Sequence, residues 1–180
     1  ATLHIEEGVK IIAVYDDIAD YILVKQGGKI NAVGTSDKPI VMTSEKEEPG
    51  AWGGIHICGR AHTNAEGGKG SSEIGGAVYG GNDDADNSGT LQYIRLEYTG
   101  FAFDEEHEAN GISFYSVGNG TIVDHCQAYK GSDDGFEFFG GSVNVSNLVA
   151  VSCSDDSFDW TEGWNGKGTN LVAYQEDKST

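Results

Sequence analysis

Carboxylate pairs recur at a fixed spacing in the second half of the chain. Asp133 and Asp134 are followed 22 residues later by Asp155 and Asp156, and Asp159 comes three residues after the second pair. If the repeat stacks, neighbouring carboxylates lie about 5 Å apart and repel one another by roughly 1 kcal/mol in water. Carboxylates relieve this repulsion by turning into solvent, by taking up protons or by binding a cation. We expect these five aspartates to bind Ca²⁺, which prefers several carboxylate and carbonyl oxygens; a solvated acidic face is the alternative.

A second oxygen-rich turn lies further upstream. Residues 84–89 place Asp84, Asp86 and Ser88 at the first, third and fifth positions of a calcium-loop opening, with Gly89 at the sixth. Arg95 stands at the twelfth position, where an EF-hand needs a bidentate glutamate, so the segment is not an EF-hand. We expect Asp84 and Asp86 to hold a cation in an isolated turn; a plain loop closed by its own aspartate side chains is the alternative.

Aromatic side chains lie close to these acids in the sequence. Tyr115, Phe139 and Trp164 fall at outward-facing strand positions or in loops, and Glu137 stands between the two aspartate pairs. An aromatic face beside a carboxylate suits a sugar ring, although the same rings can cover neighbouring strands. We expect these four residues to contact a glycan or another ligand.

The same carboxylates leave a catalytic function open. Hydrolysis of a glycosidic bond needs two carboxyl groups at a defined separation, and the chain offers more acids than one pair requires. A lyase would need a basic residue beside the calcium ion, whereas the only arginines are Arg60 and Arg95. No Ser–His–Asp, phosphate-loop or zinc motif occurs. The sequence therefore assigns no catalytic residue.

The repeat indicates which element positions these side chains. Each unit is an acidic or amide turn followed by a short strand that alternates apolar and polar residues, as in Asn110–Phe114, Asp134–Phe138 and Asp156–Trp160. A period of about 22 residues is typical of one solenoid coil. We expect an all-β, right-handed parallel β-helix with Phe114, Phe138 and Trp160 stacked in its interior. A β-sandwich is the rival fold, but it would require hairpins rather than a repeat.

The repeat is least regular in the first half of the chain. Residues 1–43 alternate short strands with glycine turns, and residues 59–90 form a Gly-, Asn- and Asp-rich excursion. We expect one β-helix domain over residues 1–180, with the excursion as a natural place for binding. Because a solenoid needs caps and neither end resembles one, we expect the chain to be part of a longer solenoid.

Composition narrows the range of partners. The net charge of −18 disfavours binding to nucleic acid and to anionic membranes, and no apolar run is long enough to insert into a membrane. Glycine contributes 27 residues and proline only 2, which suits tight stacked turns better than a disordered linker. Of the three cysteines, Cys126 is expected in the core, and a Cys126–Cys153 disulfide is left open.

Several segments together resemble a family of secreted or surface-anchored β-helix proteins of Bacteroidetes and related bacteria. The matching segments run from Gly27 to Thr35, Lys38 to Ser44, Ala51 to Ile55, Tyr79 to Leu91, Asn110 to Ile112 and Asp133 to Gly141. The resemblance covers nearly the whole chain and implies a parallel β-helix. It also implies export to the cell surface or medium, often as an outer-membrane lipoprotein. It implies no established reaction.

The sequence thus favours a binding module over an enzyme. We expect a secreted or cell-surface β-helix that binds a glycan or a surface protein and holds structural Ca²⁺. A polysaccharide-degrading hydrolase or lyase that uses the stacked aspartates is one alternative. A structural accessory subunit of an outer-membrane complex is another. A glycan array separates binding from a scaffold role, and release of reducing sugar or of unsaturated uronides separates an enzyme from both.

Overall fold

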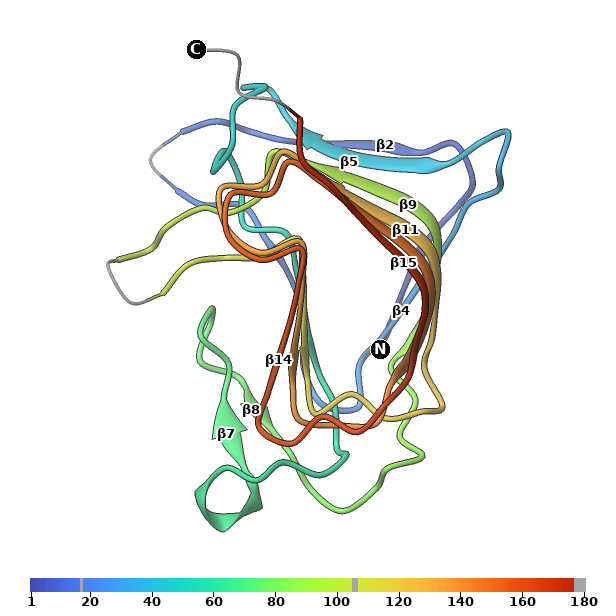
Figure 1. Cartoon of the computed structure of the whole chain (residues 1–180), viewed down its shortest axis with the longest axis vertical. Coiled ribbons are helices and arrows are strands. Elements are labelled where there is room, and N and C mark those ends of the chain that lie inside the picture. Colours follow the sequence, from blue (N-terminus) through green and yellow to red (C-terminus); the bar gives the residue numbers. More distant parts are fainter. Residues whose placement is uncertain (17, 105–106, 177–180) are drawn as a thin grey trace.

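The computed structural model describes residues 1–16, 18–104 and 107–176. Within these ranges nearly all regular structure is β-strand, and successive coils stack on one another along a single axis (Figure 1). A 3₁₀ turn at Glu66–Gly68 is the only helical element in the described part of the chain. The strands are β1 (Thr2–Ile5), β2 (Lys10–Ala13), β3 (Ile22–Val24), β4 (Lys29–Val33), β5 (Ile40–Ser44), β6 (Ile55–Cys58), β7 (Gly70–Ser71), β8 (Val78–Tyr79), β9 (Gly89–Glu97), β10 (Ile112–Tyr115), β11 (Ile122–Tyr129), β12 (Phe136–Phe139), β13 (Asn144–Val151), β14 (Phe158–Thr161) and β15 (Gly168–Tyr174).

Two parallel sheets form the walls of the solenoid. An eight-stranded sheet runs in the order β1-β4-β9-β11-β13-β15, with β2 and β5 attached beside it. A five-stranded sheet runs in the order β14-β12-β10-β6-β3. The strand pairings in both sheets are parallel. The protein is therefore a parallel β-helix, as predicted, and the β-sandwich is excluded.

The sequence repeat corresponds to one coil of the solenoid. Phe136 of β12 pairs with Phe158 of β14, and Ile122 of β11 pairs with Asn144 of β13, so both walls advance by 22 residues per coil at this level. Because the spacing is the same on both sheets, residues at one position of the repeat form a column along the axis. A column of apolar residues builds the core, and a column of acids builds a charged face.

The core is a stack of side chains from consecutive coils. The rings of Phe114 and Phe138 lie parallel with centroids 5.0 Å apart, and those of Phe136 and Phe158 lie 5.5 Å apart. Trp160 does not continue the buried stack as predicted, although it is in register with Phe138, because its ring is 62% exposed in the last described coil. Trp164 instead covers Phe138, with centroids 4.6 Å apart. The alternation of the repeat correctly predicts that Trp160 is in register with Phe138. It does not predict whether another residue covers the Trp160 ring.

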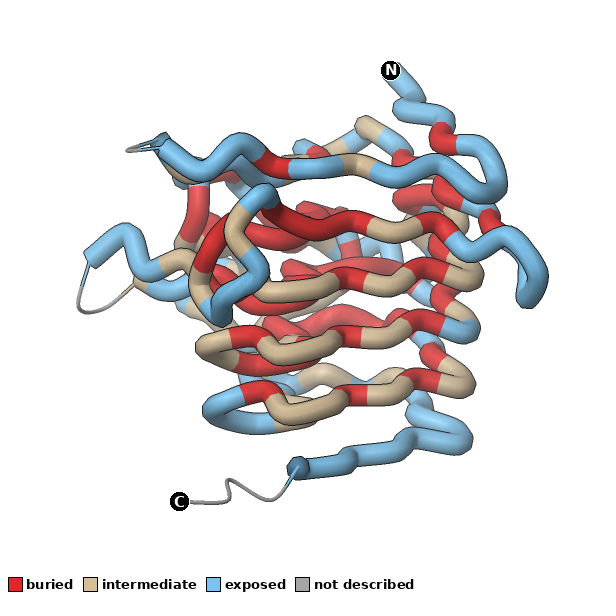
Figure 2. The backbone as a smooth tube through the Cα atoms, turned by 90° about the horizontal axis from the view of Figure 1, so that it is seen from above, coloured by how far each residue is buried: buried red, intermediate tan, exposed pale blue. Residues whose placement is uncertain are grey.

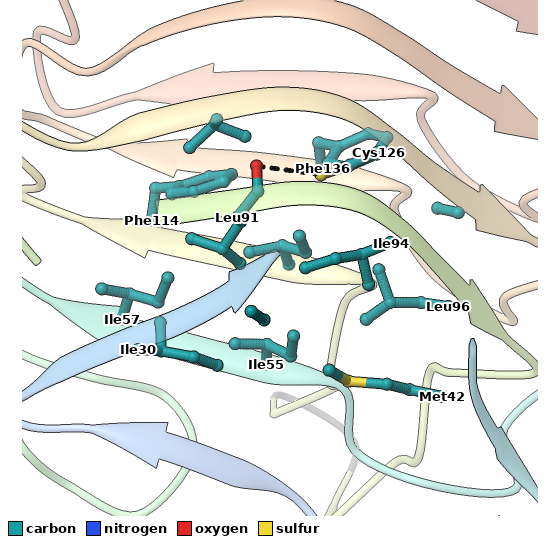
Figure 3. Close-up of a cluster of buried hydrophobic side chains, with 14 of the residues drawn as sticks. Ile30, Met42, Ile55, Ile57, Leu91, Ile94, Leu96, Phe114, Cys126 and Phe136 are labelled. Carbon is teal, nitrogen blue, oxygen red and sulfur yellow. Dashed lines mark hydrogen bonds between the residues drawn. The ribbon is translucent and has the colours of Figure 1, made fainter. Parts of the chain in front are cut away.

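Burial follows the coils closely. Figure 2 shows buried and less buried residues alternating along each coil, as expected for strands with one face on the core. Figure 3 shows part of this core, where the Cys126 thiol lies 3.6 Å from the carbonyl oxygen of Leu91. Cys126 is buried as predicted, and Cys58, Cys126 and Cys153 are all free thiols, so the Cys126–Cys153 disulfide is absent.

Glycines at the start of the five-stranded sheet allow the turns of successive coils to stack closely. A Cβ atom on Gly135 would lie 2.8 Å from the carbonyl oxygen of Ser157 in the next coil, and one on Gly111 would overlap the carbonyl oxygen of Gly135. Each glycine directly follows a polar residue of the repeat: Asn110 precedes Gly111 and Asp134 precedes Gly135. Asn110 and Asp134 therefore occupy equivalent positions on consecutive coils.

Residues 59–88 leave the two walls between β6 and β9. They contain the 3₁₀ turn and the antiparallel hairpin β7–β8, which lies beside the five-stranded sheet (Figure 1). Ala77 and Tyr79 of this excursion pack on Cys58, Tyr115 and Phe139, which face outward from that sheet. The excursion thus covers part of the outer face of the five-stranded sheet.

Candidate functional site

An acidic pocket lies on the outer face of the five-stranded sheet. Its lining residues are all carboxylic acids, and its cavity volume is about 230 Å³. Five of them come from the stacked coils, in the turns before β12 and β14 and on those strands. Two come from outside the coils. The seven residues are Glu73, Glu108, Asp133, Asp134, Glu137, Asp155 and Asp159.

The stacked repeat positions five of these acids. Asp133 and Asp134 end the turn before β12, and Asp155 occupies the equivalent turn before β14, one coil later. Glu137 and Asp159 are direct partners in the parallel pairing of the two strands, and their column continues upward through Ser113. The pairing of Glu137 with Asp159 follows the 22-residue period of the repeat.

Two loops bring further acids to the pocket from the sides. Glu73 lies between the strands of the β7–β8 hairpin. Glu108 lies on a second hairpin, in which the amide of Phe103 donates to the carbonyl of His107 at 2.9 Å and that of Ala109 to the carbonyl of Phe101 at 3.0 Å. Both hairpins project on the side of β14 (Figure 1). Sequence reasoning missed Glu73 and Glu108, because neither belongs to the repeat.

The carboxylates form two groups of three with one member in common. Each group has one carboxylate oxygen per residue, and these oxygens all lie within 4.8 Å of one another. The first group is Asp133, Asp134 and Asp155, and the second is Asp134, Glu137 and Asp159. The second group lies deeper, since it has no exposed member. Asp134, which is buried, is shared by both groups.

Burial and crowding raise the pKa values of three acids in this pocket. Burial, followed by the charges of Glu73, Asp134 and Asp159, raises the pKa of Glu137 to about 9. Burial raises the pKa of Asp134 to about 7, with neighbouring aspartates adding to the effect. Burial and then Glu108 and Asp155 raise the pKa of Asp133 to about 6. The pocket thus disfavours the full set of negative charges that it would carry without a counter-charge.

Polar partners fix two of the pocket acids. The Asn110 amide nitrogen donates to Glu137 Oε2 at 2.5 Å and to Ser113 Oγ at 3.1 Å. The backbone amide of Asp156 donates to Asp134 Oδ1 at 2.8 Å. The Tyr115 hydroxyl donates to Glu73 Oε2 at 3.3 Å, which ties the hairpin to the wall. These contacts hold carboxylate oxygens in place along the pocket wall.

Comparison with known proteins places this architecture in a family. A family model described as the pectate-lyase-like beta helix domain matches residues 1–180. The chain belongs to this family. Neither the search of curated proteins nor the search of solved structures found a match. The family match agrees with the parallel coils of this pectate-lyase-like β-helix.

Of the five aspartates that the sequence predicts to bind Ca²⁺, four line the acidic pocket and one does not. Asp133, Asp134, Asp155 and Asp159 of this pectate-lyase-like β-helix share the pocket. Asp156 is exposed, and its side chain is not part of the lining. It contributes its backbone amide to Asp134 instead.

Asp84 and Asp86 lie in the excursion of this β-helix, away from the pocket lining. Asp84 Oδ1 accepts from the backbone amide of His62 at 3.0 Å and contacts His62 Nδ1 at 2.8 Å. Asp86 Oδ2 accepts from the backbone amide of Arg60 at 3.1 Å. These carboxylates bind polar groups of the excursion and, within the described residues, belong to neither group of clustered acids. A cation at Asp84 and Asp86 stays a prediction.

The aromatic residues expected to face a ligand are covered in this β-helix. Tyr115 is fully buried and stacks on Phe139 with centroids 4.4 Å apart, beneath Tyr79 and Ala77 of the excursion. Trp164 packs on the core, and its indole nitrogen donates to the carbonyl of Val143 at 3.2 Å. The expected outward direction of Tyr115 and Phe139 was correct, but a segment distant in sequence covers both rings. Of the four residues, only Glu137 lines the pocket.

Proposed function

We propose that this chain is a secreted or cell-surface β-helix module that binds a divalent cation, Ca²⁺, in the acidic pocket. The observation that carries the proposal is the lining itself: seven carboxylic acids from two coils and two hairpins meet in one cavity. None of these lining residues is a lysine or an arginine, so the residues of the pocket wall supply no counter-charge of their own.

The chemistry of the pocket suits calcium. Ca²⁺ accepts six to eight oxygen ligands in flexible geometry, whereas Mg²⁺ requires a near-ideal octahedron. Two overlapping groups of three acids, with Asp134 in both, offer many oxygens in an irregular arrangement. A cation bound there would neutralise the repulsion that raises the pKa values of Asp134 and Glu137. It would also link consecutive coils to the two hairpins that carry Glu73 and Glu108.

Glycan or surface-protein binding is the second part of the proposal. The pocket opens on the outer face of the solenoid, where a bound cation could accept further oxygen ligands from an anionic sugar. Extracellular calcium modules work at millimolar calcium, which fits export, the location implied by the family resemblance. The buried Tyr115 and Phe139 do not contribute a sugar-stacking face, so the partner would be recognised through the cation and the acids.

Hydrolysis of a polysaccharide is the second candidate function. A polysaccharide substrate is compatible with the pectate-lyase-like family match. The raised pKa of Glu137 would let this residue donate a proton to a leaving group at neutral pH. Asp159, its partner one coil below, would be the second carboxyl group. A lyase reaction is less well supported, because the lining residues include no basic side chain. Release of reducing sugar from a panel of polysaccharides tests this candidate.

Thermal melts test the cation site directly. The wild-type protein is melted in EDTA and in Ca²⁺ or Mg²⁺ at constant ionic strength. At a calcium concentration 100 times the Kd, binding to the folded state alone adds about 2.7 kcal/mol, a rise of roughly 5–10 °C in Tm. Asp134→Asn, which changes both groups of three, should abolish most of this rise.

Asp156→Asn is the matched control, because it removes one charge at the neighbouring position of the repeat but outside the pocket lining. It should keep the calcium-dependent rise. If the wild-type melts in EDTA and calcium coincide, the pocket is a solvated acidic face and the proposal fails. A glycan array in calcium and in EDTA then tests the partner.

A further inference from the structure

Both ring nitrogens of His62 face an acceptor oxygen. His62 belongs to the excursion, and its Nδ1 lies 2.8 Å from Asp84 Oδ1 on the same segment. Its Nε2 lies 2.9 Å from the carbonyl oxygen of Gly163, 101 positions further along the chain, in the turn that follows β14. The imidazole therefore links the excursion to the last described coil.

Only one protonation state of the ring satisfies both contacts. A neutral imidazole has one N–H donor and one bare nitrogen, whereas an imidazolium has two donors. The Asp84 carboxylate and the Gly163 carbonyl can only accept, so a neutral ring would leave a nitrogen lone pair facing an oxygen at one end. The geometry around His62 is therefore that of the protonated ring.

The backbone of His62 is held independently of the charge on its ring. Its amide donates to Asp84 Oδ1 at 3.0 Å. Its carbonyl accepts from the amide of Gly141 at 2.8 Å and from Ser116 Oγ at 3.2 Å. Because these contacts remain when the ring loses its proton, deprotonation removes one side-chain contact without displacing the residue.

We infer that His62 is a pH-sensitive switch: its protonated ring holds the excursion against the turn after β14, and its neutral ring gives up one of the two contacts, so that the excursion opens more often. The switch concerns the movement of the excursion and does not depend on a cation in the acidic pocket.

The charges around the ring favour its protonated form. The Gly163 carbonyl and then Asp84 raise the pKa of His62 above its ordinary value of 6.5, and His62 in turn lowers the pKa of Asp84. The wall of the solenoid contacts His62 through Gly141 and Ser116, which carry no charge. A histidine whose pKa is raised in the folded state stabilises the contact fully below pH 6.5 and loses this effect as pH rises through the folded pKa.

The neighbouring charged groups have contacts of their own. Glu162, next to Gly163, accepts from Thr63 Oγ1 and from the Tyr79 hydroxyl. The remaining groups lie on the excursion: Asp83 accepts from the amide of Ala85, Asp86 accepts from the amide of Arg60, and the Arg60 guanidinium lies against Gly27. Since the bonds to Glu162 do not depend on the charge of His62, the switch changes how often the excursion opens rather than detaching it.

The Cys58 thiol reports opening of the excursion. It is buried, and its Sγ lies 3.9 Å from the carbonyl oxygen of Ala77 on the excursion. Glu73 also belongs to the excursion and lines the acidic pocket, where burial raises its pKa. Ionisation of the pocket acids therefore provides a second source of pH dependence, which the experiment has to separate from that of His62.

The rate of Cys58 modification by a maleimide, measured by peptide mapping on the full chain from about pH 5.5 to about pH 8.5, tests the switch. We expect His62→Gln to react roughly threefold or more faster than wild type at the low end, a modest factor because the ring is 30% exposed. The ratio of the two rates should fall toward one as the wild-type ring loses its proton. Thiol reactivity and ionisation of the pocket acids affect both proteins equally and cancel in the ratio. His4→Gln, at an exposed position on β1, is the matched control and should react like wild type throughout.

An NMR titration of the His62 ring supplies the second measurement. We expect the wild-type ring to titrate above pH 6.5. Asp84→Asn keeps an acceptor oxygen but removes its charge, so it should lower the pKa of the ring and shift the onset of Cys58 modification to lower pH by the same amount. A ratio of His62→Gln to wild-type rates that is the same at every pH overturns the inference, as does a wild-type ring that titrates at or below pH 6.5. If His62→Gln does not fold, the shift in Asp84→Asn decides, and its absence overturns the inference.

Discussion

Individual carboxylates in this protein lie in two opposite environments. Glu137 and Asp134 are crowded by other acids, which raises their pKa values. Asp124, on β11 of the opposite sheet, is surrounded by donors: Ser146 Oγ at 2.7 Å, Asn147 Nδ2 at 2.8 Å and His125 Nδ1 at 2.8 Å. A cation would stabilise the crowded carboxylates of Glu137 and Asp134, whereas the donors around Asp124 already stabilise its carboxylate. Only the first is therefore a candidate site.

Asp124 makes a pH-dependent contribution to stability. Burial alone would raise the pKa of Asp124, but hydrogen bonds from Asn147, Ser146 and His125 outweigh it and lower the pKa to about 2. A carboxyl group with a depressed pKa in the folded state stabilises the fold above its unfolded pKa, near 3.8, and loses this effect as pH falls through about 2. Screening by solvent limits the contribution to about 1 kcal/mol.

We therefore expect Asp124→Asn to lower the free energy of unfolding at pH 6 by about this amount, with the difference from wild type shrinking between pH 4 and pH 2. Urea unfolding at several pH values measures it. Asp37→Asn, an exposed carboxylate in a loop, is the control and should follow wild type throughout. A wild-type advantage over Asp124→Asn that stays constant down to pH 2 would contradict the account.

At the scale of elements, the repeat predicted much of the solenoid from local pattern alone. Its period gave the parallel pairing of β10, β12 and β14, and its parity placed Phe114 and Phe138 in the core and Glu137 outside. It could not place Glu73 or Glu108, because each reaches the pocket from a hairpin whose position depends on packing between segments distant in sequence. For the same reason, the repeat predicted that Tyr115 and Phe139 are exposed, whereas the excursion buries both side chains.

The attachment of the excursion to the last coils is specific. Glu162, which directly follows β14, accepts hydrogen bonds from the Tyr79 hydroxyl at 2.9 Å and from Thr63 Oγ1 at 2.6 Å. Both donors belong to the excursion. Cys58 lies beneath it, 1% exposed, in contact with the cluster formed by Tyr79, Tyr115 and Phe139. Opening of the excursion should therefore expose the Cys58 thiol.

We expect Glu162→Ala to speed modification of Cys58 by a maleimide roughly tenfold or more, since hydrogen bonds to a charged acceptor contribute about 1.5–3 kcal/mol each and 1.4 kcal/mol corresponds to a factor of ten. Peptide mapping distinguishes Cys58 from Cys126 and Cys153, which lie in the solenoid core. Glu66→Ala, an exposed acid on the same excursion, should leave the rate unchanged. Equal rates in Glu162→Ala and wild type would mean that apolar contacts alone hold the excursion.

At the scale of the whole molecule, the excess of acidic residues affects stability through repulsion over the whole surface as well as through the acidic pocket. Acidic residues number 29 against 11 lysines and arginines, which gives the net charge of −18. Self-repulsion of this size opposes the compact state and is screened by any salt. No helix in the described ranges is long and apolar enough to span a membrane.

Salt and calcium should therefore stabilise the protein by separable mechanisms. The Debye length falls from about 10 Å at 0.1 M to about 3 Å at 1 M salt. We expect NaCl in EDTA to raise the Tm of wild type and of Asp134→Asn by a similar few degrees, because diffuse repulsion involves the whole surface. Millimolar calcium should raise the Tm of wild type further even in 1 M NaCl, since close ligands in a partly buried pocket are screened much less than exposed charges. Calorimetry at the four combinations of salt and calcium measures both effects. A calcium step that vanishes in 1 M NaCl, or that Asp134→Asn retains in full, would mean that calcium acts only as a diffuse counter-ion.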